Sequence, residues 1–196
     1  MSLEITSAIP EDARRVLALT AQDLREAHLS EDEILAIADN SNNEHVETQR
    51  RRLELQPELY KVARLGFDVV GVIKTNEWFT GDQRPYASPL ELAVLRKRDL
   101  FNSHRLKGNP LGIFALSTSN DAAINRYEIA SQLLDTALEG QEEKEIRIGL
   151  RWNEPLRSLL AEEYKFQPTN KHGRQIGDVP SELYIRQPLT HSEQDQ

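Results

Sequence analysis

Short runs of alternating or β-branched residues along the chain predict its β-strands. Strict apolar and polar alternation is typical of a half-buried strand, and both ends of the chain contain such runs. Two runs rich in β-branched and aromatic residues flank Leu65-Gly66, and together they predict a β-hairpin. The predicted strands are Leu3–Ser7, Tyr60–Ala63, Phe67–Thr75, Leu111–Ser117, Glu145–Trp152 and Leu183–Arg186.

Apolar positions that recur every three or four residues predict the helices between these strands. Pro10 suits the first turn of one helix, which has a stripe of Val16, Leu17, Thr20 and Leu24. Ser30 and Glu33 form a capping box ahead of a second helix. The other predicted helices are Val46–Leu55, a short piece within Leu90–Leu100, Ala122–Leu138 with Gly140 as its end, and a helix from Pro155 to about Tyr164.

The order of elements limits the fold. The early hairpin requires antiparallel strands, whereas the strand–helix–strand unit around Ala122–Leu138 requires a parallel pair with a crossover. A mixed sheet of about six to seven strands with helices on both faces satisfies both requirements. We therefore expect an α/β (α+β) fold in one domain over residues 1–190, with an irregular insert at 78–110 and a disordered tail at 191–196.

Composition and charge narrow the class of protein. The 196 residues are 38% hydrophobic and 29% charged, as in an ordinary soluble domain, and the absence of cysteine excludes disulfides and thiolate chemistry. No apolar run approaches the roughly 20 residues of a membrane span, and the N-terminus lacks a signal pattern. We expect a cytoplasmic protein with no membrane partner. The net charge of −8 argues against non-specific nucleic-acid binding.

The common catalytic and metal-binding motifs are missing from the sequence. The five histidines are scattered without metal-ligand spacing, so no metal site is expected. There is no nucleophile elbow and no phosphate-binding P-loop. A basic cluster is either a solvated surface or a contact for an anionic cofactor; it consists of Arg96, Lys97, Arg98, Arg105 and Lys107.

Five segments resemble the GNAT superfamily of N-acetyltransferases. They are Ile9–Ala13, Phe67–Ile73, Trp152-Asn153, Leu159–Phe166 and Tyr184–Arg186. The resemblance extends over roughly Leu3–Leu189 and is better in layout than in motif. It implies a sheet whose central parallel strands splay apart, and acetyl-CoA or another acyl-CoA as co-substrate with no metal.

The resemblance also implies where this co-substrate binds. Leu116 and Ser117 would hold the pantetheine arm, and Asn153 would lie on its far side. The pyrophosphate would bind the start of a helix at Asn125, Arg126, Tyr127, Glu128, Ile129 and Ala130, because a helix N-terminus offers unpaired N–H donors to an anion. The insert carries Trp78, Phe79 and Tyr86, which either fill the core or contact the acceptor substrate.

Three positions depart from the pattern of the family. Glu128 and Lys165 occupy positions where glycine is usual, and a carboxylate at the first would repel phosphate if it faced the anion. Ala161 stands where many members have the tyrosine that protonates the leaving thiolate. Tyr164 is the nearest candidate, three positions further along the helix.

Two functions follow from these observations. One is an N-acetyltransferase that passes an acyl group to a small-molecule or peptide amine by direct attack. The alternative is a catalytically inactive GNAT-fold module with a binding or regulatory role, which the three departures favour. Exposed strand edges and the apolar insert are compatible with a homodimer. The net charge disfavours a nucleic-acid-binding domain.

Overall fold

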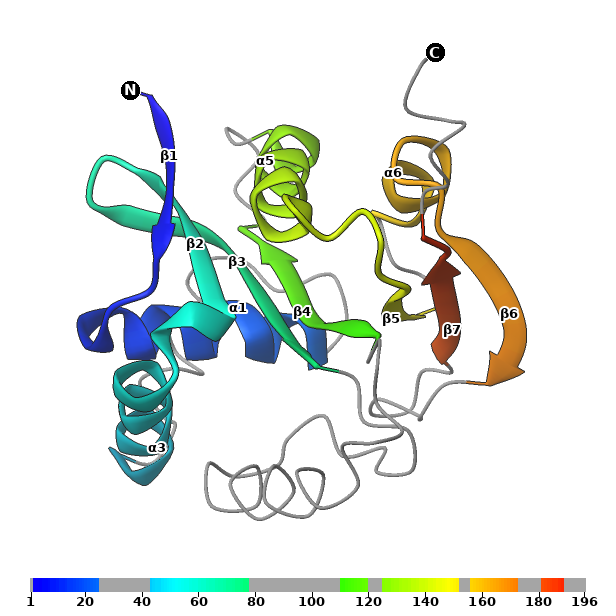
Figure 1. Ribbon diagram of the computed structural model, residues 1–196. Coiled ribbons are helices and arrows are strands. Elements are labelled where there is room, and N and C mark those ends of the chain that lie inside the picture. Colours follow the sequence, from blue (N-terminus) through cyan, green and yellow to red (C-terminus); the bar gives the residue numbers. More distant parts are fainter. Residues whose placement is uncertain are drawn as a thin grey trace.

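The computed structural model describes residues 2–24, 43–77, 110–119, 125–151, 156–172 and 181–188. Within these ranges seven strands form one sheet in the order β1-β2-β3-β4-β5-β7-β6 (Figure 1). The strands are β1 (Leu3–Ser7), β2 (Tyr60–Leu65), β3 (Asp68–Glu77), β4 (Leu111–Thr118), β5 (Ile146–Arg151), β6 (Gln167–His172) and β7 (Ser181–Arg186). The helices are α1 (Ala13–Leu24), α3 (Asn43–Leu55), α5 (Arg126–Leu138) and α6 (Arg157–Glu162), with 3₁₀ turns η1 (Pro10–Asp12) and η2 (Pro57–Leu59).

The sheet is mixed, as the order of elements predicts. Strands β1 to β4 pair antiparallel, β4 and β5 pair parallel, and β5, β7 and β6 pair antiparallel. The predicted hairpin is present as β2 and β3, and Gly66 in its turn has a φ of 65°, a conformation that glycine adopts without steric cost. The predicted crossover is α5, which joins the parallel strands β4 and β5.

Two hydrophobic cores cover the two faces of the sheet. Neighbouring residues of β3 point to opposite faces, so that Val72 belongs to one core and Ile73 to the other. Helices α1 and α3 cover the Val72 face, while α5 and α6 cover the Ile73 face (Figure 1). Phe166 follows α6, is fully buried and belongs to the core on the Ile73 face.

The apolar stripe of α1 differs from the predicted one. Val16 is fully buried, as expected, and Leu19 is fully buried too, whereas Leu17 is only half-buried. Thr20 is half-buried, and its hydroxyl donates to the backbone oxygen of Val16 at 2.9 Å. Helix α1 begins after the 3₁₀ turn at Pro10–Asp12, and its buried face includes Ala13, Val16 and Leu19.

The structure contains one strand that the sequence pattern missed, and the ends of several predicted elements are shifted. Strand β6 was not predicted, because Gln167–His172 is polar and contains Pro168, which a strand tolerates at the edge of a sheet. Helix α5 begins at Arg126 rather than Ala122, because Asn125 caps it. Helix α6 ends at Glu162, short of the predicted Tyr164.

Several predicted segments lie outside the described residues. They are the helix from Ser30, the piece within Leu90–Leu100, most of the insert at 78–110, the basic cluster and the tail at 191–196. None of the helices in the described ranges is long and apolar enough to cross a membrane.

Candidate active site

The central parallel strands separate after three residue pairs. Strand β4 pairs with β5 at Leu111–Ile146, Gly112–Arg147 and Ile113–Ile148. Both strands then continue, β4 to Thr118 and β5 to Arg151, without further pairing between them. The structure therefore has the splayed central strands that the family resemblance implies.

A β-bulge at Phe114 accounts for the separation. Lys74 of β3 is opposite Ala115 and Thr75 is opposite Ile113, so Phe114 is an extra residue in β4. A bulge bends its strand and increases the local twist. This one follows directly after Ile113, the last residue of β4 that pairs with β5, so β4 turns away from β5 at that point.

Buried polar residues follow the splayed half of β4. Leu116 and Ser117 pair with Ile73 and Val72 of β3, so the other edge of β4 is the one that faces the opening. Leu116, Ser117, Thr118 and Ser119 are all buried. The structure thus places the two residues predicted to hold pantetheine on the strand segment that borders the opening.

Helix α5 begins beside the end of this strand. Asn125 caps it: the side-chain Oδ1 accepts from the backbone N–H of Glu128 at 3.3 Å. Arg126 is half-buried, and its Nε donates to the hydroxyl of Thr118 at 3.1 Å. The predicted phosphate-binding segment therefore lies at the mouth of the opening, but its cap already engages one of the first-turn N–H groups that a phosphate would use.

The six residues of this segment have different environments. Ile129 and Ala130 are buried in the core and can offer only backbone groups to a ligand. Tyr127 and Glu128 have exposed side chains. The first turn of α5 thus carries one guanidinium, which is held by Thr118, and one exposed carboxylate.

Gly71 allows α5 to approach the sheet, a role that the sequence did not reveal. A Cβ atom at Gly71 would lie 2.6 Å from Cγ2 of Ile129 and 3.1 Å from Cδ1 of Leu133. Gly71 pairs with Thr118 across β3 and β4. The missing side chain therefore sets the position of the α5 N-terminus relative to the splayed strand. The only signal in the sequence was a glycine within an otherwise β-branched run.

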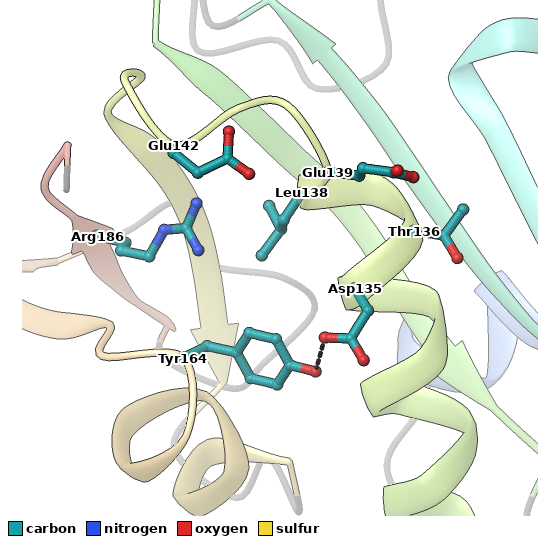
Figure 2. A pocket seen from close by; sticks show the side chains of 7 residues that line it. All are labelled: Asp135, Thr136, Leu138, Glu139, Glu142, Tyr164 and Arg186. Atoms are coloured by element: carbon teal, nitrogen blue, oxygen red, sulfur yellow. Dashed lines mark hydrogen bonds between the residues drawn. The ribbon is translucent and has the colours of Figure 1, made fainter. Parts of the chain in front are cut away.

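Tyr164, the predicted proton donor, packs against α5. Its single hydroxyl proton has two acceptors within reach, Oδ1 of Asp135 at 2.8 Å (Figure 2) and the backbone oxygen of Ser131 at 2.9 Å. Burial, and to a lesser extent the hydrogen bond to Asp135, raises the pKa of Tyr164 to about 12. The hydroxyl therefore stays protonated at neutral pH, but its proton is already engaged in hydrogen bonding to α5.

An open hollow of about 440 Å³ adjoins Tyr164. Arg186, which also lines it, pairs with Ile146 at the start of β5. The hollow therefore lies on the side of the sheet where β4 and β5 still pair, whereas the opening lies beyond Ile148. Its lining residues are Asp135, Thr136, Leu138, Glu139, Glu142, Tyr164 and Arg186 (Figure 2).

The remaining predicted site residues lie outside the described residues. These are Asn153 on the far side of the cofactor, and Trp78, Phe79 and Tyr86 in the insert. Within the described ranges no group of three or more His, Asp or Glu side chains is placed to hold a metal ion.

Comparison with known proteins gives a clear result only at the level of structure. No family model and no curated protein sequence matches the chain. The structure of the NatC complex bound to Gag peptide and CoA matches with a TM-score of 0.60 at 15% identity, over 97% of this chain and 100% of that one. The yncA protein of Salmonella typhimurium, solved with acetyl-CoA, matches with a TM-score of 0.58 at 13% identity, over 98% and 97% of the two chains.

A third match names the fold family. An acetyltransferase of the GNAT family from Bacillus cereus has a TM-score of 0.56 at 9% identity, over 97% of this chain and 100% of that one. The mixed seven-stranded α/β sheet of this chain matches the fold of these solved structures. The chain therefore has the GNAT fold, as its sequence resemblance implies, in a divergent sequence.

Proposed function

We propose that this protein is an N-acetyltransferase that binds acetyl-CoA between β4 and β5 and acetylates a primary amine. The observation that carries the proposal is the separation of β4 from β5 after Ile113, next to the start of α5. An amide-rich pantetheine arm suits such an opening, since backbone groups along a strand edge need hydrogen-bond partners. The likeness to solved acetyltransferases supports the fold on which this proposal rests.

The residues present fit this co-substrate with altered phosphate contacts. Leu116 and Ser117 border the opening and would hold the pantetheine arm. Arg126 would supply the positive charge for the pyrophosphate, because its guanidinium is held at the mouth by Thr118. Glu128 weakens the attraction for the pyrophosphate, because its negative carboxylate lies in the same helical turn as Arg126. Asn153, outside the described residues, is proposed for the far side.

The chain's own groups for the reaction are few. Acetyl-CoA, when bound, supplies an acetyl group activated as a thioester. The acceptor must arrive as a neutral amine, because an ammonium has no lone pair for attack. The splayed half of β4 carries hydroxyls but no carboxylate, so a water relay or the acceptor's own pKa would have to supply the neutral amine. The proposal gives Tyr164 no proton-transfer step, because its hydroxyl bonds to Asp135 and Ser131 beside the hollow and not at the opening. Trp78, Phe79 and Tyr86 are proposed as the acceptor contacts.

Calorimetric titration with acetyl-CoA tests the proposal. We compare the natural protein with Glu128→Gly, which removes the carboxylate, and with Glu128→Gln, which removes only its charge. Micromolar binding by the natural protein, strengthened in both variants, supports a working cleft. A screen of small amines and peptide N-termini then seeks the acceptor. Absence of binding by all three proteins rejects the cleft.

A catalytically inactive GNAT-fold module is the second candidate. Glu128 in the first turn and the Asn125 cap favour it, because both reduce the attraction of the α5 N-terminus for phosphate. This function predicts that the natural protein does not bind acetyl-CoA and that Glu128→Gly restores binding.

A further inference from the structure

Arg186 is a buried cation with unsatisfied donors. The residue is 9% exposed, and its Nε and Nη2 atoms have no hydrogen-bond partner among the described residues. Burial lowers the pKa of Arg186, and the Glu142 carboxylate only partly opposes this effect. A buried donor without a partner destabilises the folded protein, and more so when it is charged. The unsatisfied donors of Arg186 indicate that a bound molecule supplies their hydrogen-bond acceptor.

Arg186 lines the open hollow beside Tyr164 (Figure 2). In Figure 2 its guanidinium points toward Leu138, and Glu142 stands above it. The volume of about 440 Å³ falls within the roughly 300–1,000 Å³ of small-molecule sites. The hollow is assembled from α5, the loop before β5, the turn after α6 and β7, so residues far apart in the sequence meet there.

The other charged groups of the hollow are all acidic. They are Asp135 on α5, Glu139 at the C-cap of α5 and Glu142 in the following loop. Asp135 accepts the Tyr164 hydroxyl at 2.8 Å, and Glu142 accepts the backbone N–H of Gly140 at 3.1 Å. Three carboxylates against one guanidinium leave an excess of negative charge, since neither of these neutral donors cancels a full charge.

This charge pattern selects among ligand classes. A simple anion would satisfy Arg186 but would be repelled by three carboxylates. A polyamine would pair with the carboxylates but would leave the donors of Arg186 unsatisfied. A molecule with one carboxylate and two cationic groups complements both. Its apolar stem would lie against Leu138, as the methylene chains of amphipathic side chains do on apolar surfaces.

We propose that the hollow binds a free α-amino acid with a cationic side chain. The α-carboxylate pairs with Arg186, and the two cationic groups pair with Asp135, Glu139 and Glu142. The site is separate from the opening between β4 and β5 and does not depend on acetyl-CoA.

NMR titration of the isotopically labelled protein with L-lysine tests this proposal, with cadaverine as a matched probe. Cadaverine is L-lysine without its carboxylate. We expect L-lysine to shift the amide signals of Glu139–Glu142 and Tyr164, and to bind at least about tenfold more tightly than cadaverine, because one charge-assisted pair contributes about 1.4 kcal/mol or more. Shifts confined to residues 114–119 would place the amino acid in the opening and overturn the proposal.

Two variants identify the partners. Arg186→Met keeps a long side chain without donors, and should reduce L-lysine affinity about tenfold without weakening cadaverine, which loses a like-charge repulsion. Glu142→Gln should weaken both probes. Equal affinity of the two probes for the natural protein overturns the proposal, and this comparison needs no variant should Arg186→Met fail to fold. Unchanged L-lysine affinity in a folded Arg186→Met protein overturns it as well.

Discussion

Substitution of Gly71 by alanine should force α5 away from the sheet. The added Cβ would lie 2.6 Å from Cγ2 of Ile129, a distance that real Cβ contacts do not show, and 3.1 Å from Cδ1 of Leu133. Ile129 is 3% exposed, and its Cγ2 is attached to a branched Cβ with one strongly preferred rotamer in a helix. The side chain therefore cannot move aside, and the helix backbone must shift.

The size of the effect follows from two opposing contributions. Overpacking a buried contact costs about 1–3 kcal/mol. Replacing glycine by alanine also restricts the unfolded chain, which stabilises the folded state by about 0.4–1 kcal/mol. Gly71→Ala should therefore lower the free energy of unfolding by about 1–2 kcal/mol. It should also weaken acetyl-CoA binding, because the shift separates Arg126 from Thr118.

Urea denaturation measures the change, with Gly149→Ala as the matched control. Gly149 is also in a central strand, but a Cβ there would meet nothing within 4 Å. The control should be neutral or up to about 1 kcal/mol more stable than the natural protein. The difference between the two variants then isolates the steric contact.

A double-mutant cycle with Ile129→Ala tests whether the contact with Ile129 causes the destabilisation by Gly71→Ala. Ile129→Ala alone should cost about 2–5 kcal/mol, because it leaves a cavity in the core. It also removes Cγ2, so Gly71→Ala should no longer destabilise the protein in that background. The reasoning is refuted if Gly71→Ala behaves like Gly149→Ala, or if its cost is the same with and without Ile129.

Three further predictions concern single residues. Lys165 has a φ of 59°, so Lys165→Gly should raise the free energy of unfolding by about 1 kcal/mol. Gly140 has a φ of 69°, so Gly140→Ala should lower the free energy of unfolding by a similar amount. Guanidinium denaturation measures both changes, and shifts of the same sign contradict the reasoning. Asp12 is buried and accepts from Arg64 at 2.5 Å and from Ile9 N–H at 2.8 Å, so Asp12→Asn should cost about 3 kcal/mol in urea denaturation, and a change below about 1 kcal/mol would show that the pair contributes little. The pKa of Tyr164 is raised from 10.0 to about 12, so its contribution to stability is present below pH 10 and is lost as the pH rises through 12. Tyr164→Phe should remove that part of the pH dependence between pH 10 and 12 and the corresponding tyrosinate absorbance, and an unchanged absorbance titration would refute it.

The strands and helices could be predicted largely from local pattern. Leu3–Ser7 forms β1 as predicted, and the hairpin and the crossover helix are present. The predictions failed where the local sequence does not determine the secondary structure. Strand β6 is polar and gains its conformation from backbone pairing with β7, and the start of α5 depends on which residue caps it.

The candidate site was only partly predictable. Leu116, Ser117 and the segment from Asn125 to Ala130 were placed by resemblance, and the structure brings them to one opening. The bulge at Phe114, which creates the opening, depends on the register between β3 and β4. Periodicity reports which face of a strand is buried, but not which residue lies opposite which.

By itself the sequence determined the class of sheet, the turns and the two-sided core, because these depend on interactions between residues close together along the chain. The separation of β4 from β5, the contact of Gly71 with Ile129 and the burial of Arg186 were decided only by the tertiary structure. Each of them joins residues that are more than thirty positions apart, or depends on packing between separate elements. Local propensity carries no information about such distant contacts.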